Sequence, residues 1–174
     1  MDTWWDLGID DATVVWFVQD VGPERRLVDY LEVSGEGLPE IVKRIEAKDY
    51  RLGVHVLPHD VEARELGTGR TRLETLKALG LRNIQVIPQQ SVADGINAVR
   101  LMLSRCWFDA EKCARGIEAL KQYRREWDGK RQTWREKPLH DWTSHAADAA
   151  RYGALARPVV KSADRLVIPS FGAV

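Results

Sequence analysis

The first third of the chain contains three short runs of residues rich in Val, Ile, Trp and Tyr. The runs span residues 3–9, 12–21 and 26–33, and turn-forming residues such as Gly22 and Pro23 separate them. β-Branched and aromatic residues favour strands, and short turns between successive runs favour hairpins. This pattern predicts three consecutive strands in an antiparallel meander.

The period of the apolar residues changes after residue 37. Over residues 38–49 the apolar positions recur three and four residues apart, which is typical of an amphipathic helix. Two strand and helix pairs follow this helix. The strands are predicted at 53–58 and 83–89. The first helix is predicted at 71–80, where Gly80 ends it. The second is predicted at 91–106, with Ser91 as N-cap and with Ile96, Val99 and Leu103 on one face.

The remaining part of the chain is predicted to be mainly helical. A short apolar segment at 106–108 precedes a helix over 109–125, and a polar loop over 128–137 leads to a final helix over 143–155. The inner face of the helix over 109–125 is predicted to carry Cys113, Ile117, Leu120 and Tyr123. Hairpin-connected strands followed by alternating helices and parallel strands predict an α/β fold, in which helices flank a mixed five-stranded sheet.

Length and composition favour one globular domain. The chain has 174 residues, of which 44% are hydrophobic and 30% are charged, and this balance excludes disordered and collagen-like classes. We assign residues 1–157 to the domain and 158–174 to a C-terminal linker or docking segment. No apolar run reaches about 18 residues and the N-terminus lacks a signal peptide pattern, so we expect an intracellular protein without a membrane span.

The charges balance overall but not locally. Lys and Arg number 26, as do Asp and Glu, so net charge predicts no general attraction to nucleic acid. The segment 111–137, however, carries nine basic and five acidic residues, interleaved with Tyr123, Trp127 and Trp134. Such a surface suits contact with DNA phosphates without sequence readout, although a solvated helix with buried aromatic residues has the same pattern.

Three acidic residues occupy positions where chemistry is expected. Asp6 ends the first predicted strand, Asp60 directly follows the fourth, and Asp148 lies among alanines on the final helix. Ligands of such sheets bind at the carboxyl ends of strands, and a charge in a tightly packed apolar helix needs a partner. Three converging carboxylates suit Mg²⁺ or Mn²⁺, and a pair of such ions about 4 Å apart can activate water and stabilise the leaving oxygen of a phosphodiester.

These residues also carry a resemblance. The segments DLGIDDAT (residues 6–13), VLPHD (56–60) and HDWTSHAADAARY (140–152) resemble the nuclease domain of phage terminase large subunits, in motif order and spacing over residues 2–157. The resemblance implies a ribonuclease H-like fold and two-metal cutting of concatemeric double-stranded DNA during viral genome packaging. It also implies that Asp6, Asp60 and Asp148 are the catalytic metal ligands. It also implies an upstream ATPase domain, a small terminase subunit and the portal as partners, in the host cell cytoplasm rather than in the virion.

Several further residues are weaker candidates. Asp141 is a candidate accessory metal ligand, with capping of the final helix as the alternative. Asp11 and His145 are candidates for a supporting role around the metal ligands, although Asp11 equally suits the first hairpin turn and His145 a structural role. The candidate DNA-binding residues are Arg124, Arg125, Lys130, Arg131 and Arg135.

Other functions fit parts of the sequence. A GxxxxGK[ST] phosphate loop is absent, so the motor activity of a terminase would reside in another domain. A non-catalytic docking module, an actin-like phosphotransferase and another ribonuclease H-like nuclease such as a junction resolvase are the alternatives. The two His-Asp pairs at 59–60 and 140–141 resemble the ligands of metal-dependent phosphohydrolases, but that fold is all-helical and the strand-rich first half argues against it.

Overall fold

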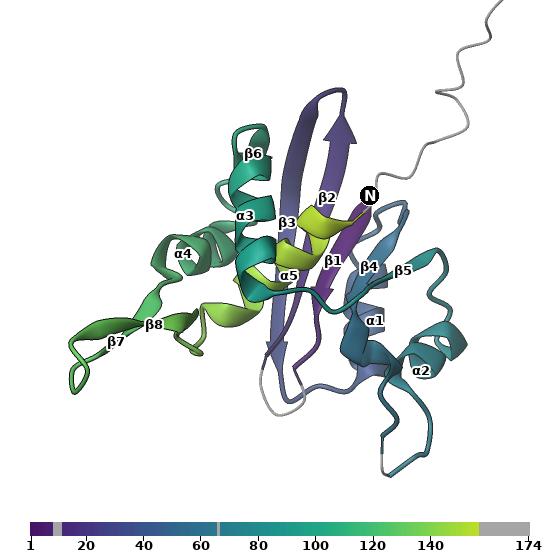
Figure 1. The fold of residues 1–174 in the computed structure, drawn as a ribbon. Helices are drawn as coiled ribbons and strands as arrows, with labels where there is room; N and C mark the ends of the chain where they lie inside the picture. Colours follow the sequence, from purple (N-terminus) through teal and green to yellow (C-terminus); the bar gives the residue numbers. More distant parts are fainter. Residues whose placement is uncertain (9–11, 66, 157–174) are drawn as a thin grey trace, which may run out of the picture.

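The computed structural model describes residues 1–8, 12–65 and 67–156. Its main sheet has six strands in the order β5-β4-β1-β2-β3-β6, and a separate hairpin pairs β7 with β8 (Figure 1). The strands are β1 (Asp2–Asp6), β2 (Ala12–Val21), β3 (Glu24–Ser34), β4 (His55–Pro58), β5 (Ile84–Ile87), β6 (Cys106–Phe108), β7 (Arg125–Asp128) and β8 (Thr133–Pro138). The helices are α1 (Leu38–Glu46), the 3-10 helix η1 (His59–Glu62), α2 (Arg72–Ala78), α3 (Val92–Leu103), α4 (Ala114–Gln122) and α5 (Ser144–Leu155).

The main sheet is mixed, as the sequence predicts. Strands β1, β2 and β3 form the antiparallel meander, while β4 pairs parallel with β1 and β5 parallel with β4. The predicted strand number of five is wrong, because residues 106–108 form a sixth strand that pairs parallel with Arg25–Leu27 of β3. Three residues are too few to show a period in the sequence, and this strand forms because the long β3 offers an unpaired edge.

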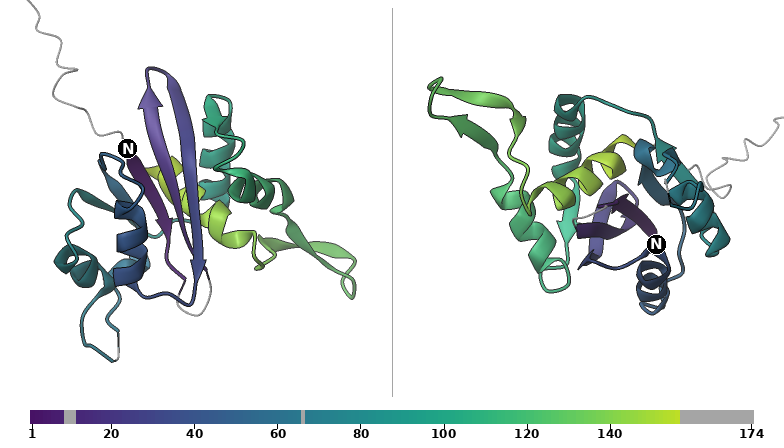
Figure 2. Two further views of the ribbon diagram at one scale, coloured as in Figure 1. Left: turned by 180° about the vertical axis from the view of Figure 1, so that it is seen from behind. Right: turned by 90° about the horizontal axis from the view of Figure 1, so that it is seen from below.

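Helices cover both faces of the main sheet. Helices α1 and α2 lie on one face, and α3, α4 and α5 on the other (Figure 2). Residues Val14–Val18 in β2 are therefore all buried, and alternate residues contribute to two separate cores. Trp4 and Trp16 belong to the core beneath α5, whereas Trp5 and Phe17 belong to the core beneath α1.

Helix ends follow the sequence signals closely. Thr71 and Glu74 form a capping box at α2, Ser91 accepts a hydrogen bond from the Asp94 amide at α3, and Gly80 follows α2 with φ of 100°. One predicted face is wrong: Leu103 is 41% exposed, and Met102 is buried in its place. The burial of Gly95 and Met102 shows that α3 turns a slightly different face to α5 than the apolar periodicity indicates.

The polar loop predicted over 128–137 is instead the β7–β8 hairpin, which projects from the body of the molecule (Figure 1). Trp127 pairs with Trp134 across the hairpin, and their ring centroids are 5.1 Å apart. Aromatic pairs of this kind stabilise two-stranded ribbons, which explains why a segment rich in charged residues folds as strands. Helix α4 is correspondingly shorter than predicted, because β7 begins at Arg125.

Small residues let α5 lie very close to the sheet. A Cβ atom on Gly153 would lie 1.8 Å from the Trp4 indole, and the Trp16 indole N–H donates a 3.0 Å hydrogen bond to the Ala146 carbonyl. Ala146 and Ala149 are fully buried between these contacts. The helix is therefore fixed in position along β1 and β2 by two tryptophans and by residues that lack bulk.

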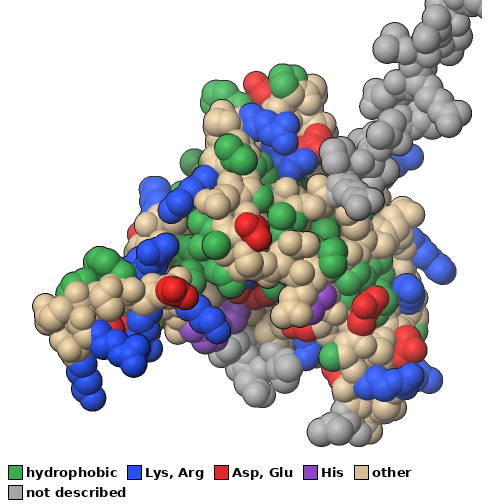
Figure 3. Space-filling model, in the orientation of Figure 1, with side chains coloured by type: hydrophobic (Ala, Val, Ile, Leu, Met, Phe, Trp, Pro, Cys, Tyr) green, Lys and Arg blue, Asp and Glu red, His purple; other side chains and the backbone are tan. Residues whose placement is uncertain are grey.

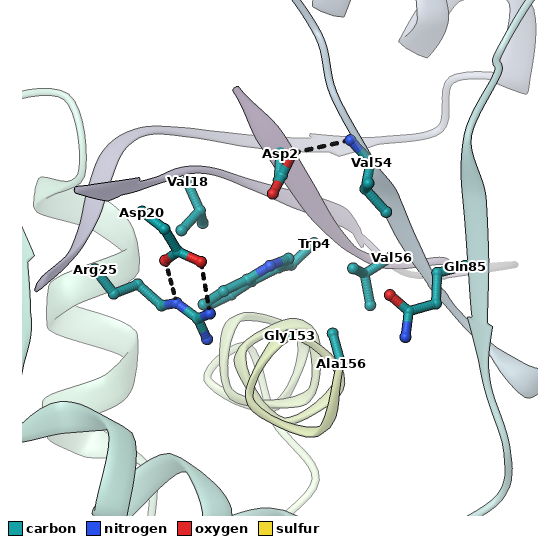
Figure 4. A pocket seen from close by; sticks show the side chains of 10 residues that line it. All are labelled: Asp2, Trp4, Val18, Asp20, Arg25, Val54, Val56, Gln85, Gly153 and Ala156. Atoms are coloured by element: carbon teal, nitrogen blue, oxygen red, sulfur yellow. Dashed lines mark hydrogen bonds and ion pairs between the residues drawn. The ribbon is translucent and has the colours of Figure 1, made fainter. Parts of the chain in front are cut away.

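The end of the sheet at the start of β1 holds only a small cavity. A cavity of about 30 Å³ lies there beside Trp4 and Gly153, and the Asp20–Arg25 ion pair lines it (Figure 4). This space suits a single water molecule rather than a substrate. No described helix is long and apolar enough to cross a membrane.

A chain of buried hydrogen bonds joins β1 to β4. The Trp5 indole N–H donates to the Thr3 hydroxyl at 2.7 Å, and that hydroxyl forms a second hydrogen bond of 2.7 Å with Nδ1 of His55. Burial, the largest influence, lowers the pKa of His55 to about 4, so the folded state holds the uncharged ring.

This buried histidine makes stability depend on pH. In the unfolded chain the His55 pKa is near 6.5, so between pH 6.5 and 4 the unfolded state binds more protons than the folded state. The contribution of the neutral His55 to the free energy of unfolding is fully present above pH 6.5 and is lost as the pH falls towards 4. We expect wild type to lose about 2 kcal/mol more unfolding free energy than His55→Gln between pH 7 and pH 5, measured by urea denaturation. Equal losses in both proteins would show that His55 is not held neutral.

The close approach of α5 makes a second prediction. Gly153→Ala should reduce the free energy of unfolding by about 2–3 kcal/mol, because the new methyl group overlaps Trp4 and this outweighs the gain in helix propensity of about 1 kcal/mol. Gly129→Ala is the matched control, since a Cβ atom there meets nothing within 4 Å. Thermal and urea denaturation of both variants test the expectation, which a neutral Gly153→Ala would contradict.

Candidate functional site

The predicted carboxylates gather at the carboxyl ends of β1 and β4. Asp6 is the last residue of β1, Asp60 lies in η1 directly after β4, and Asp148 lies on α5. Strands β1 and β4 are parallel neighbours, so their carboxyl ends meet at the same edge of the sheet. The charges of Asp148 and Asp60 both act on Asp6, so both of these side chains lie within electrostatic reach of Asp6.

The strand register places Asp6 on the face of the sheet that α5 covers. Asp6 pairs with Val14 and Trp4 with Trp16, so these four side chains share one face. Val14, Trp4 and Trp16 all belong to the core beneath α5. A shift of one residue would turn Asp6 to the face of α1 and separate it from Asp148.

The packing of α5 then sets how far along β1 its polar residues lie. Gly153 sits against Trp4, and Asp148 is five residues earlier, which is about 7.5 Å along a helix. Asp6 lies two residues beyond Trp4, which is about 7 Å along a strand. These two steps match, so the helix brings Asp148 and His145 alongside Asp6, and His145 Nδ1 donates a 3.0 Å hydrogen bond to Asp6 Oδ2.

Asp6 is a largely buried acid close to other negatively charged side chains. Its side chain is 15% exposed, and burial is the largest cause that raises its pKa. The negative charges of Asp148 and Asp60 raise that pKa further, whereas the hydrogen bond from His145 lowers it. The environment therefore favours a positively charged group beside Asp6.

Asp148 is held by an arginine on its own helix. Nε and Nη2 of Arg151 donate to Asp148 Oδ1 at 3.0 and 2.6 Å, and the two side chains are only 10% and 25% exposed respectively. Burial raises the pKa of Asp148, and Arg151 opposes this shift. Gly95 of α3 leaves room for the arginine, since a Cβ atom there would lie 3.0 Å from Arg151 Cδ.

The described side chains do not form a ready metal site. Within residues 1–8, 12–65 and 67–156, no three His, Cys, Asp or Glu side chains are gathered closely enough to hold an ion. Asp60 is exposed, while Asp6 and Asp148 point to His145 and Arg151. The donor set nevertheless fits a hard divalent cation chemically, because it consists of carboxylate oxygens whose mutual repulsion a cation would relieve.

The weaker candidates have local partners or lie elsewhere. Asp141 Oδ1 accepts hydrogen bonds from the amide and hydroxyl of Thr143 at 2.9 and 2.5 Å, and Arg124 lies 3.6 Å from its other oxygen. These bonds, chiefly the one from the Thr143 side chain, lower the pKa of Asp141. Asp141 thus stabilises the turn before α5, and its role as a metal ligand stays a prediction. Asp11 lies outside the described residues.

The candidate DNA-binding residues lie on and beside the projecting hairpin, where blue side chains gather in Figure 3. Lys130 and Arg131 are exposed in the hairpin turn. Arg135 forms ion pairs with Glu126 at 2.8 Å and with Asp128 at 3.9 Å, so part of its charge is balanced within the hairpin. Arg124 lies at the base, next to Asp141.

Three further residues lie around the carboxylates. Arg151 neutralises Asp148, and the i, i+3 spacing of the two residues is the signal that identifies such a pair. Tyr152 and Tyr123 lie close by: burial, followed by the charges of Asp6 and Asp148, raises the pKa of Tyr152. Burial, followed by the charge of Asp148, raises the pKa of Tyr123 to about 12. The sequence predicts Tyr123 on the inner face of its helix and includes Tyr152 in the segment 140–152, but no pattern places either tyrosine beside the acids.

Comparison with solved structures identifies the fold. The chain is similar to the large terminase of the thermophilic bacteriophage D6E, with a TM-score of 0.63 and 17% identity over 88% of this chain and 38% of that one. It is also similar to the P22 large terminase nuclease domain (TM-score 0.62, 18% identity, 87% of this chain and 77% of that one). The nuclease domain of the SPP1 large terminase, solved with bound Mn, aligns with a TM-score of 0.52 and 15% identity over 86% of this chain and 82% of that one.

These similarities show that the chain has the fold of large terminase nuclease domains, which is the ribonuclease H-like fold predicted from the sequence. The chain spans 38% of the length of the D6E large terminase. No protein-family model matches the sequence, and no curated protein matches it significantly.

The contact between Arg151 and Asp148 predicts strong thermodynamic coupling. Arg151→Met should lower the free energy of unfolding by about 3 kcal/mol, because it leaves Asp148 charged and largely buried without a partner. In the Asp148→Asn background the same change should cost about 1 kcal/mol or less. A double-mutant cycle by urea denaturation at pH 7 measures this coupling of about 2 kcal/mol. Equal losses in both backgrounds would exclude the ion pair as a stabilising contact.

Proposed function

We propose that this chain is a metal-dependent endonuclease domain that cuts concatemeric double-stranded DNA, without strong sequence specificity, during viral genome packaging. The observation that carries the proposal is that Asp6 and Asp60 lie at the neighbouring carboxyl ends of β1 and β4, with Asp148 of α5 within electrostatic reach of Asp6. The fold shared with large terminase nuclease domains supports it, as does the Mn bound in the SPP1 structure.

Asp6, Asp60 and Asp148 are the residues that would hold two Mg²⁺ or Mn²⁺ ions. When bound, the ions supply an activated water and charge stabilisation for phosphodiester hydrolysis, so no protein nucleophile is required. His145 positions the Asp6 carboxylate through its 3.0 Å hydrogen bond, and Arg151 positions that of Asp148. Asp141 is the candidate accessory ligand. Asp11 and His145 are the candidates for supporting the metal ligands.

The hairpin region supplies contacts to the DNA phosphates in this proposal. Its basic residues bind the backbone without reading the sequence, which suits an enzyme that cuts DNA of any sequence. The residues assigned to this contact are Arg124, Arg125, Lys130, Arg131 and Arg135.

The same proposal implies partners and a cellular location for this domain. An ATPase domain, a small terminase subunit and the portal would be the partners, and the reaction would take place in the host cell cytoplasm rather than in the virion. The length of the D6E large terminase, of which this chain covers 38%, is consistent with a further domain in such a protein.

A second candidate is a non-catalytic docking module of a packaging motor. The observation that favours it is the ion pair of Asp148 with Arg151, which leaves the described carboxylates without a preformed three-ligand site. A junction resolvase has the same fold class and would differ in acting on branched DNA.

Cutting of supercoiled plasmid tests the proposal directly. We expect nicking and linearisation with Mg²⁺ or Mn²⁺ and none with EDTA. Asp60→Asn and Asp148→Asn should each lower the rate about 100-fold or more, since each removes a negative ligand from the reaction centre. The control Asp49→Asn changes an exposed acid after α1 and should cut at the wild-type rate. Unchanged cutting by the two site variants would contradict the assignment.

Metal binding has a second readout that does not depend on cutting. At about 100 times its dissociation constant, a bound ion adds about 2.7 kcal/mol to the free energy of unfolding and raises the melting temperature by about 5–10 °C. We expect this shift with Mn²⁺ in wild type and its loss in Asp6→Asn, measured by calorimetry. A shift without cutting would support a structural metal in a docking module, and the absence of both would leave the docking module without metal.

A further inference from the structure

A groove of about 600 Å³ lies between α3 and the base of the β7–β8 hairpin. Its apolar lining comes from residues of α3, from Pro138 and from the ring of Tyr123. The residues that line it are Val92, Ala93, Ile96, Asn97, Arg100, Tyr123, Arg124, Arg125, Glu136, Lys137 and Pro138.

The rim of the groove is strongly basic. Arg100, Arg124, Arg125 and Lys137 are all exposed there, against the single acid Glu136. In the part of the chain that the structure describes, Arg100, Arg125 and Lys137 form no ion pair with any acid. These three positive charges are available to a ligand.

The groove opens beside the carboxylates. Tyr123 lies within electrostatic reach of Asp148 and Arg151. On the side of α3, Gly95 packs against the Arg151 side chain, one residue before Ile96 in the groove lining. A polymer in this groove would therefore lie close to the proposed cutting site.

The combination of an apolar lining, an aromatic ring and a basic rim identifies the class of ligand. Duplex DNA presents mainly phosphates to a protein surface, so an apolar lining would gain nothing from it. An unpaired strand presents both phosphates and the faces of its bases, and proteins bind such strands with basic grooves that contain aromatic side chains. An acidic peptide would satisfy the basic rim but offers no planar group for Tyr123.

We propose that this groove binds an unpaired DNA strand next to the cut, with Arg100 and Lys137 on its phosphates and a base against Tyr123. This inference rests on the proposed nuclease function and extends it to the strand end beside the reaction centre. It assigns Arg100, Asn97, Lys137 and Tyr123 to a site separate from the duplex contacts of the hairpin turn.

Fluorescence anisotropy of labelled DNA tests the groove. The full chain in EDTA is titrated with a 20-nucleotide oligothymidine and with a duplex of 20 base pairs at several salt concentrations. Arg100→Ala/Lys137→Ala should weaken oligothymidine binding about tenfold and lower the slope of log affinity against log salt by about 1.4, since each phosphate contact to a single strand contributes about 0.7. Tyr123→Leu should weaken it about tenfold without changing the slope.

The matched control is Lys77→Ala/Arg82→Ala, which removes two exposed basic residues at and after the end of α2. It should leave oligothymidine affinity within about twofold of wild type. Melting temperatures verify that each variant is folded, and because Arg100 and Lys137 are exposed their loss should not disturb the fold.

Three outcomes would overturn the proposal. Unchanged oligothymidine affinity and slope in the groove variants would show that the strand binds elsewhere. Equal losses for duplex and oligothymidine would make the groove part of a duplex phosphate surface. Binding of a labelled oligoglutamate peptide that the groove variants lose, while they keep oligothymidine, would identify an acidic protein segment as the occupant.

The binding test is independent of the cutting test. If plasmid cutting fails with every metal but oligothymidine binding depends on the groove, the nuclease proposal falls and the groove stands as a nucleic-acid site. If cutting depends on Asp60 and Asp148 but the groove variants bind oligothymidine normally, only the groove proposal falls.

Discussion

The close packing of α5 on β1 and β2 is the constraint on which the candidate site depends. Gly153 admits the Trp4 ring, and the Trp16 indole bonds to the Ala146 carbonyl, so the helix has one position along the strands. Asp148 and Asp6 belong to segments that are 142 positions apart in the chain, and only this packing brings them together. Side chains of ordinary size at the contact would push the helix outwards and separate the carboxylates, which is why the helix is so rich in alanine.

The acids of the candidate site are only partly stabilised by their neighbours. Burial raises the pKa of Asp6 and of Asp148, and the charges of Asp148 and Asp60 raise that of Asp6 further, whereas His145 and Arg151 partly offset these effects. A core of aliphatic residues in the same place would be more stable, so the acids are retained at a cost to folding. Such a cost is typical of sites that bind a cation or act on a charged substrate. The neutral His55 on the neighbouring strand shows the contrasting case, in which Trp5, Thr3 and His55 form hydrogen bonds with one another.

The two sides of the candidate site differ in structure. Asp6 and Asp148 are held by β1 and α5 in the body of the molecule, whereas the β7–β8 hairpin stands away from the body and carries its charge on an exposed surface (Figures 1 and 3). The groove at the base of this hairpin joins the two, because α3 lines it and also packs against α5. A substrate held by the hairpin would thus be positioned relative to the carboxylates through α3.

The sequence by itself determined the local features of this protein. Turn residues and apolar periodicity located the meander and most helices, Ser91 marked a helix start, and the acids at the ends of predicted strands indicated the candidate site. Tertiary structure alone decided that residues 106–108 form a sixth strand, that the segment 128–137 is a hairpin, and that Arg151 and His145 hold the acids. It also created the groove. The physical reason is that propensity and periodicity act over a few neighbouring residues, whereas strand pairing and helix packing depend on the free energy of contacts between distant segments, and a three-residue strand or a single partner residue leaves no periodic signal.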